Sequence, residues 1–212
     1  MMSEFRRQSM LHSFQGASDE PKDRMALLFY MQHHGVPTRL LDWSSNPFIA
    51  LYFALAGAKR ADDGVCNEPA AVWILDPYQW NRHALFDLGW GDNGPAHADD
   101  ERIKSYLPRR IDWTQPVSRY PLPIALSGTV NTPRMMAQRG NFTIFSDELR
   151  PMEIIYDSEN FPADCLTRLE VQPAHVDPIL KVLLAVGYTD SVAYPDLEGL
   201  AMEIKRLYGF LP

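Results

Sequence analysis

The pattern of apolar and polar positions changes along the chain, with helical spacing in some segments and short strand-like apolar runs in others. Apolar residues recur at helical spacing before Gly35 and in two C-terminal segments, and short apolar runs between Gly, Pro or polar residues are typical of strands. We expect helices that end near residue 34 and that span residues 134–138, 175–186 and 197–207. We expect strands over residues 38–43, 70–75, 124–126, 141–145, 154–156 and 165–171. These elements predict an α+β fold with a mixed, mainly antiparallel sheet, flanking helices and a helical C-terminus.

The most apolar predicted helix follows a polar turn at residues 42–46. Its apolar side chains leave no polar face, so we expect it to be buried between other elements: Phe48, Ile49, Leu51, Tyr52, Phe53 and Leu55. Ser44, Ser45 or Asn46 can cap it, and Pro47 suits its first position. A buried helix presents its first N–H groups and positive dipole end to the turn, which favours an anionic group such as a phosphate. The alternative is that Ser45 or Asn46 alone satisfies those donors.

Composition and charge narrow the class of protein. The chain has 212 residues, which we interpret as one domain over residues 1–212. Its net charge of −7 argues against broad electrostatic capture of nucleic acid or of an anionic membrane, so we expect neither as a partner. The one basic candidate is the segment 106–110.

Cysteine usage and the absence of targeting signals indicate the compartment. Cys66 and Cys165 lie far apart without metal-type spacing, so neither a disulfide framework nor a zinc site is predicted. The N-terminus has no charged-then-apolar signal segment, and the longest apolar run, residues 48–56, is too short to span a bilayer. We therefore expect reduced thiols and a cytoplasmic location.

Residues 32–55, QHHGVPTRLLDWSSNPFIALYFAL, resemble the central signature of the FRG domain family. In that family a Q-H-aromatic-G-x-P-T-R-L-L-D-W block precedes an N-P-x-x-A-L-Y-F-A helix. Two later segments, RMMAQRGNFTIF and AVGYTDSVAYPDLEGLAMEI, resemble the family's R-x-x-x-Q-x-G-x-F segment and its closing G-(I/Y)…(F/Y)-P-D-L-(D/E)-G-L segment. The resemblance therefore extends from about residue 20 to the C-terminus.

The chain departs from the family at its N-terminus, where the family carries the Phe-Arg-Gly strand. Phe5-Arg6-Arg7 matches that motif only in part, and its closeness to Gln32 indicates the helix that follows the true motif. We expect a domain truncated at the N-terminus that lacks its first strand. A missing strand would leave an unpaired sheet edge and remove one arginine from any site built there.

The strand, turn and helix around residue 46 are similar to the second motif of ADP-ribosyltransferases, with the A-x-x-F-A pattern at residues 50–54. Arg139-Gly140 is placed like that superfamily's third motif. This analogy, made at the level of the fold, implies an ADP-ribosyltransferase-like fold with NAD as the cofactor. In this interpretation His33 binds a ribose or phosphate, Arg39 pairs with the pyrophosphate, and Gln138 takes the position of the catalytic carboxylate.

The nucleotide site would be completed by Trp43, Ser45 and Asn46. Because a Gln side chain cannot ionise, Asp42 or Glu153 would have to act as the general base. Asp42 would also stabilise an oxocarbenium-like sugar electrostatically. No metal is expected, since adjacent helical histidines point in different directions and metal-type spacing is absent.

Each of these residues also has a structural interpretation. Arg39 and Asp42 can form a buried salt bridge that holds the turn. His33 can interact with the last carbonyls of its helix, and His34 is expected to pack. Gln138 can pair with buried backbone.

Two hypotheses follow. In the first, a cytoplasmic bacterial FRG-domain protein binds NAD or another nucleotide and transfers or hydrolyses its ADP-ribose. In the second, the chain is a non-catalytic sensor module that recognises a nucleotide, a nucleotide-modified target or a protein. Gln138 and the missing first strand favour the second hypothesis. The sequence indicates neither a target macromolecule nor an oligomeric state.

Overall fold

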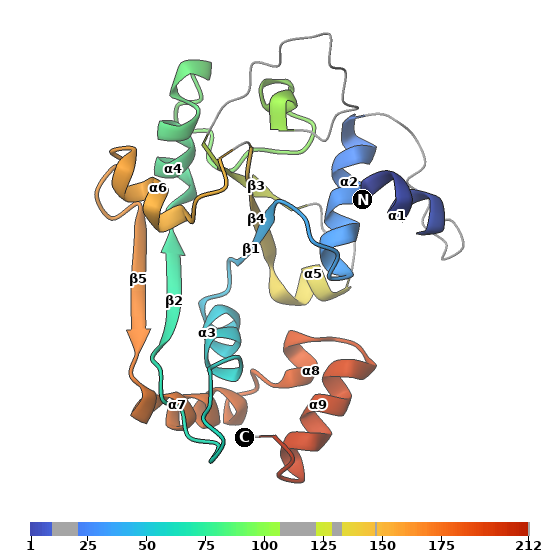
Figure 1. Cartoon of the computed structure of the whole chain (residues 1–212), viewed down its shortest axis with the longest axis vertical. Coiled ribbons are helices and arrows are strands. Elements are labelled where there is room, and N and C mark those ends of the chain that lie inside the picture. The colour runs from blue at the N-terminus through green and yellow to red at the C-terminus, as the bar shows by residue number, and fades with distance from the viewer. Residues whose placement is uncertain (10–20, 107–121, 129–132, 147, 212) are drawn as a thin grey trace. The chain divides into compact units, whose positions relative to one another are not determined.

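The computed structural model describes residues 1–9, 21–106, 122–128, 133–146 and 148–211 (Figure 1). Its elements divide between two compact units. Unit 1 consists of Met1–Asp42, Asp76–Thr129 and Asn141–Cys165, and unit 2 consists of Trp43–Leu75, Val130–Gly140 and Leu166–Pro212. The boundaries near the candidate site fall inside two strands, between Asp42 and Trp43 and between Gly140 and Asn141.

Unit 1 holds most of a three-stranded sheet together with several helices. The helices are α1 (Met2–Ser9), α2 (Pro21–His33), α4 (Pro77–Ala84), η2 (Phe86–Leu88), η3 (Glu101–Tyr106) and α6 (Met152–Ser158). The strand order is β1 (Leu40–Ser44), β4 (Gly140–Ile144) and β3 (Ile124–Ser127). β3 and β4 are antiparallel. Because Phe145 N–H donates to the Arg39 carbonyl while Ser45 N–H donates to the Arg139 carbonyl, β1 and β4 are antiparallel as well.

Aromatic stacking and one buried amide hold unit 1 together. Phe29 of α2 stacks on Phe142 of β4, with ring centroids 4.7 Å apart, and Trp80 of α4 stacks on Phe161 at 4.0 Å. The buried Asn81 side chain accepts from Ala125 N–H at 2.7 Å and donates to the Ala125 carbonyl at 2.8 Å. This amide therefore continues the hydrogen bonding of β3 into α4.

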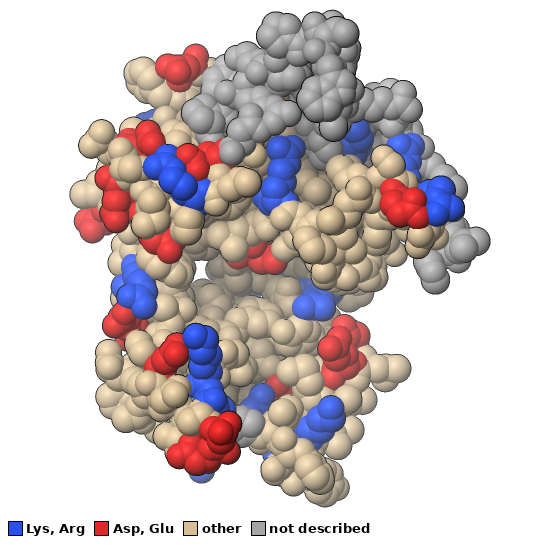
Figure 2. Space-filling model, viewed as in Figure 1, with Lys and Arg blue, Asp and Glu red and all other residues tan. Residues whose placement is uncertain are grey.

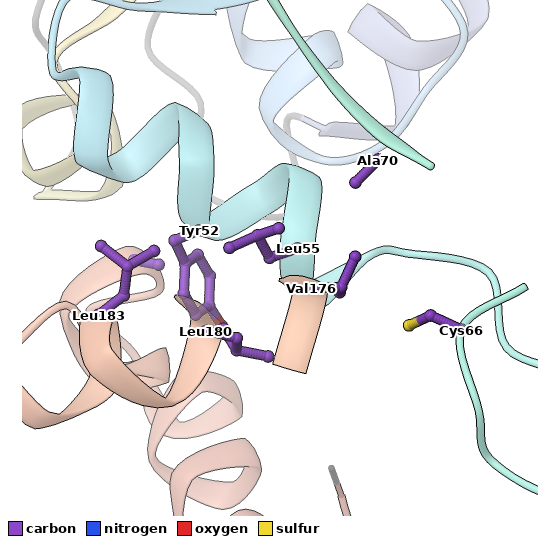
Figure 3. Packing of buried hydrophobic residues seen from close by; sticks show 8 residues of the cluster. Tyr52, Leu55, Cys66, Ala70, Val176, Leu180 and Leu183 are labelled. Atoms are coloured by element: carbon purple, nitrogen blue, oxygen red, sulfur yellow. The ribbon is translucent and has the colours of Figure 1, made fainter. Parts of the chain in front are cut away.

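Unit 2 combines a two-stranded sheet with a group of helices. β2 (Ala70–Leu75) pairs antiparallel with β5 (Leu166–Val171), and the helices are α3 (Pro47–Ala56), α5 (Pro133–Gln138), α7 (Pro173–Ala185), α8 (Asp190–Ala193) and α9 (Leu197–Leu207). α3 packs on α7. Figure 3 shows the core between them, where the buried residues are Tyr52, Leu55, Cys66, Ala70, Val176, Leu180, Leu183 and Ala193.

The α+β class is confirmed, and so are most predicted elements, including the helical ends at residues 33, 138 and 207. Phe5-Arg6-Arg7 lies in α1 and is helical, as expected. The ADP-ribosyltransferase-like arrangement and the single domain over residues 1–212 stay predictions. Of the basic segment 106–110, all but Tyr106 lies outside the described residues.

One strand prediction is wrong. Residues 154–156 belong to α6, in which Met152 and Ile155 are buried while Ile154 is exposed. Burial of every third residue is the helical period, and Pro151 at the N-cap suits the start of a helix. A three-residue apolar run is too short to distinguish the two periods from the sequence.

The expected burial of α3 on every face is also wrong. Ile49, Tyr52 and Leu55 are buried on one face of the helix, whereas Phe48 is 49% exposed. Phe48 instead lies beside Tyr188, with ring centroids 5.1 Å apart. Burial therefore covers only part of the circumference of α3, although its side chains are apolar on every face. Both α7 and β2 contact this helix.

Candidate functional site

The polar turn begins where α2 ends. α2 stops at His33, and Gly35 adopts a left-handed φ of 69°. Gly35 N–H donates to the Gln32 carbonyl at 3.0 Å, and Val36 N–H donates to the Met31 carbonyl at 3.0 Å. A glycine in this conformation is a common helix end because it lacks a Cβ. The predicted helix end before Pro37 is therefore confirmed.

Gln32 organises the turn in unit 1. Its amide Nε2 donates to Asp42 Oδ2 at 2.7 Å, and its Oε1 accepts from Thr38 Oγ1 at 2.5 Å. Thr38 Oγ1 also accepts from the backbone N–H of Leu40 at 3.0 Å. A continuous chain of hydrogen bonds thus runs from the start of β1 through Thr38 and Gln32 to the exposed carboxylate of Asp42.

Sequence reasoning missed the roles of Gln32 and Thr38. Both residues stand in the quoted Q-H-H-G-V-P-T-R block, so the resemblance carried the signal. The carboxylate at residue 42 has at least one fixed partner, and that partner is held by a second contact.

The other candidate residues of unit 1 lie in or beside α2, β1 and α6. Arg39 Nη2 donates to the backbone carbonyl of Tyr106, which joins the start of β1 to η3. The ring of His34 packs against Tyr30 at 4.5 Å and against His33 at 4.9 Å, both edge to face. The prediction that His34 packs is therefore confirmed. Glu153, the alternative base, lies exposed in the first turn of α6.

In unit 2 the turn becomes the cap of α3. Asn46 Oδ1 accepts from Phe48 N–H at 3.0 Å, and Pro47 occupies the first helical position. Ser44 Oγ accepts from Asn46 N–H at 3.0 Å, and Ser45 N–H donates to the Arg139 carbonyl at 3.1 Å. These bonds confirm Asn46 as the cap and show that its side chain engages one N–H group in the first turn of α3. The anion at this helix end stays a prediction.

Gln138 lies at the end of α5 and joins two parts of unit 2. Its carbonyl accepts from Ser44 Oγ at 2.6 Å, so the end of β1 contacts the backbone of Gln138. Its side-chain Nε2 donates to the Ala193 carbonyl at 2.9 Å, at the end of α8. The amide therefore pairs with backbone, as the structural interpretation expected. The catalytic roles of Gln138, His33 and Asp42 and the cofactor-binding roles of Arg39, Trp43, Ser45 and Asn46 stay predictions.

A buried polar cluster in unit 2 was not predicted. Asp190 is fully buried and accepts from Tyr52 Oη at 2.5 Å and from Arg206 Nε and Nη2 at 2.8 and 2.9 Å. Burial by itself raises the pKa of the Asp190 carboxyl, but the hydrogen bonds from Arg206 and Tyr52 outweigh it and hold that pKa below its usual value. Burial, followed by the bond to Asp190, raises the pKa of Tyr52. This cluster links α3, α8 and α9.

The cap of α3 leads to a first prediction. Replacing Asn46 with alanine removes the acceptor for Phe48 N–H and is expected to lower the free energy of unfolding by about 1 kcal/mol. Asn46→Asp retains an acceptor at the helix N-terminus and should cost much less. Urea denaturation followed by circular dichroism measures both. Equal losses in the two variants would contradict the assigned cap.

The described residues show how charge is distributed on the surface and whether side chains are grouped for metal binding. Figure 2 shows acidic and basic side chains interspersed on the visible face, which agrees with ion pairs such as Arg60–Asp177 and Arg150–Glu159. Among the described residues no group of three or more His, Cys, Asp or Glu side chains is placed to hold a metal ion. None of the helices described is long and apolar enough to cross a bilayer.

Comparison with known proteins bears on residues 1–63. The model of the FRG domain matches this segment, which contains α1, α2, β1 and α3 and hence Gln32, Arg39, Asp42 and Asn46. The two later segments that resemble the family lie outside the matched residues. Neither a curated protein nor a solved structure gives a significant match to the chain. An FRG domain is therefore present in this chain, and the resemblance to that family is confirmed.

Proposed function

We propose that the FRG domain of this protein is a nucleotide-binding module that recognises a ribose-containing nucleotide such as NAD. The observation that carries the proposal is the exposed carboxylate of Asp42, which is oriented by the 2.7 Å hydrogen bond from Gln32. His33, Thr38 and Arg39 belong to the same unit as Asp42. Nucleotide binding is the first candidate function, and catalysis is the second.

An oriented carboxylate suits the hydroxyl groups of a ribose. An ionised carboxylate only accepts hydrogen bonds, and its two oxygens offer about four acceptor sites. Neighbouring ribose hydroxyls are donors, as in other folds where an acidic residue after a strand binds a ribose. Because Gln32 is itself held by Thr38 at 2.5 Å, the carboxylate is ordered before a ligand arrives. Such order reduces the entropy lost on binding.

Arg39 supports the same class of ligand through its charge. It directly precedes β1, three residues before Asp42, and its Nη2 is anchored on the Tyr106 carbonyl. A guanidinium is permanently charged and matches the geometry of phosphate oxygens. We assign to Arg39 the pairing with a pyrophosphate and to His33 a hydrogen bond to a ribose or phosphate oxygen.

Binding without turnover is favoured by the position of Gln138. Its side chain cannot ionise, and its amide donates to the Ala193 carbonyl. ADP-ribosyl transfer or NAD hydrolysis is the second candidate function, because the oriented carboxylate of Asp42 has the charge needed to stabilise an oxocarbenium-like sugar. Recognition of a protein instead of a nucleotide is the third candidate function.

Isothermal titration calorimetry with NAD, ADP-ribose and nicotinamide tests the proposal. NAD and ADP-ribose should bind and nicotinamide should not, since it lacks the ribose and pyrophosphate. Asp42→Asn should weaken binding about tenfold, the loss typical of a hydrogen bond to a charged group. Gln32→Met should weaken it less, because the carboxylate remains but is no longer oriented. Asp157→Asn, at an exposed position of α6, is the matched control and should bind like the wild type.

Release of nicotinamide, measured on the same preparations, separates the candidate functions. Binding without release supports the module. Release that is lost in Asp42→Asn establishes the enzyme instead. If neither NAD nor ADP-ribose binds the full chain, the nucleotide proposal is wrong in both forms.

A further inference from the structure

The loop that follows α4 and η2 in unit 1 contains the dipeptide Asn93-Gly94, the one Asn-Gly pair in the sequence. Asn93 is exposed, whereas Gly94 is buried and adopts a left-handed φ of 71°. In an Asn-Gly pair the backbone nitrogen of the glycine can attack the side-chain amide of the asparagine, because a glycine has no side chain that hinders the approach. The dipeptide is therefore a candidate for covalent modification.

Hydrogen bonds at this loop hold one of the two reacting groups and not the other. The nucleophile would be the backbone nitrogen of Gly94, which donates to no acceptor among the residues that the structure describes. The electrophile would be the side-chain carbonyl carbon of Asn93. The nitrogen of that side chain, which would leave, donates to the Trp90 carbonyl. The asparagine side chain is therefore tethered and must leave Trp90 before it can meet the glycine nitrogen.

The carbonyl of Gly94 is bound by two buried donors. It accepts from Asn81 Nδ2 at 2.9 Å and from Trp90 Nε1 at 2.8 Å. Asn81 is 0% exposed and Trp90 is 2% exposed. The same Asn81 nitrogen donates to the Ala125 carbonyl at 2.8 Å, so this amide joins the loop to β3. The backbone that follows the candidate dipeptide bond is therefore fixed to α4 and, through Asn81, to β3.

We propose that Asn93 is a site of spontaneous deamidation and that the folded loop slows this reaction. The backbone nitrogen of Gly94 gives its proton to solvent and attacks the side-chain carbonyl carbon of Asn93. A C–N bond forms and closes a five-membered succinimide, while the bond to the side-chain nitrogen breaks. That nitrogen takes a proton from water and leaves as ammonia. Water then opens the ring at either of its carbonyl carbons, which yields aspartate or isoaspartate, and nothing is oxidised or reduced.

The two products act differently on unit 1. Aspartate retains the length of the backbone and adds a negative charge at an exposed position. Isoaspartate adds one CH2 group to the main chain before Gly94, which displaces the Gly94 carbonyl from Asn81 and Trp90. A buried donor that loses its acceptor lowers the free energy of unfolding. Formation of isoaspartate therefore weakens the attachment of the loop to α4 and β3, and this inference is independent of nucleotide binding.

Peptide mass spectrometry of the full chain, incubated at neutral and at mildly alkaline pH, measures the reaction. Residue 93 should gain the mass of an amide replaced by a carboxyl group, and faster at the higher pH because the glycine nitrogen must lose its proton. In concentrated urea the rate should rise at least tenfold, since opening the loop releases the tether. Asn67 is the internal control, because it is exposed but followed by Glu68, and it should stay unmodified. Asn93→Gln should abolish the reaction, since its ring would have six members.

The stability of the modified chain tests the consequence. Ion exchange separates it from the unmodified chain by its additional negative charge, and a protease that cleaves before aspartate but not before isoaspartate measures the share of each product. Asn93→Asp is the matched variant, because it has the same charge and an unextended backbone. The isoaspartate form should unfold at a lower urea concentration than Asn93→Asp. No mass gain at residue 93, equal rates with and without urea, or a modified chain as stable as Asn93→Asp would each overturn the proposal.

Discussion

Replacing Asp190 with alanine is expected to lower the free energy of unfolding by about 3–5 kcal/mol, the largest loss that we predict for a single side chain. The substitution removes the acceptor for Tyr52 Oη and for two guanidinium nitrogens of Arg206. It leaves a positive charge without its partner in the interior of unit 2. Removing one partner of a buried ion pair lowers the free energy of unfolding by far more than the intact pair raises it.

Urea denaturation followed by far-ultraviolet circular dichroism measures this loss. Asp177→Ala is the matched control, because Asp177 binds two nitrogens of Arg60 in the same bidentate manner but is exposed. Solvent screens an exposed pair, so the control should lose less than about 1 kcal/mol. Tyr52→Phe removes one bond to the charged group and should lie between the two. Equal losses for Asp190→Ala and Asp177→Ala would mean that Asp190 is not buried.

The same cluster predicts how stability depends on pH. The pKa of the Asp190 carboxyl lies below its usual value in the folded chain, so the folded state binds its proton less readily than the unfolded state. The stabilisation is therefore present above the unfolded pKa and is lost as the pH falls through the lowered pKa. As the pH is lowered, the free energy of unfolding should fall less steeply in Asp190→Asn than in the wild type. Urea denaturation at a series of acidic pH values measures this difference.

Gly199→Ala is expected to destabilise the chain by about 3 kcal/mol or more, at the upper end of the range for overpacking. A Cβ at residue 199 would lie 1.9 Å from the Tyr194 carbonyl oxygen and 2.9 Å from the Asp190 carbonyl oxygen. Both are backbone atoms and cannot move independently. α9 would have to shift away from α8, which would also disturb the contacts of Glu203 and Arg206.

The sign of this effect makes the test sharp. In an ordinary helix interior, replacing glycine with alanine stabilises by about 1 kcal/mol. Gly140→Ala is the matched control, because a Cβ there would lie 3.7 Å from the nearest atom outside its chain neighbours, which is an ordinary contact. Thermal unfolding of the two variants should give a large loss for Gly199→Ala and a small change for Gly140→Ala. A stabilised Gly199→Ala variant would disprove the close approach of α8 and α9.

The local elements of this protein could be predicted because their causes lie within a few residues. The starts of α3 and α9 depend on the side chains of Asn46 and Asp196, which accept from neighbouring backbone N–H groups. The end of α2 depends on Gly35, whose left-handed φ is tolerated because it lacks a Cβ. α4 was missed although the signal was present. The strand predicted over residues 70–75 ends just before Asp76-Pro77, and Asp76 also caps the following helix.

The candidate site was predicted as a segment but not as a set of contacts. The resemblance indicated residues 32–46, and the FRG match to residues 1–63 includes them. The hydrogen bond from Gln32 to Asp42 joins residues on a helix and a strand, and no periodicity encodes it. The sequence leaves Ser44, Ser45 and Asn46 as alternative caps of α3, and the 3.0 Å hydrogen bond from Phe48 N–H identifies Asn46 as the cap.

The sequence by itself determined most of the helices and strands, how most of those end, and which family signature the first 63 residues carry. Those properties depend on short-range backbone geometry and capping. Only the tertiary structure decided that Tyr52, Asp190 and Arg206 meet in one buried cluster and that α9 turns its polar face inward. These contacts join residues that are far apart in the sequence. Which of them pair is decided by the packing of the whole unit, because a buried charge or hydrogen-bonding group needs a partner that only the packing brings near.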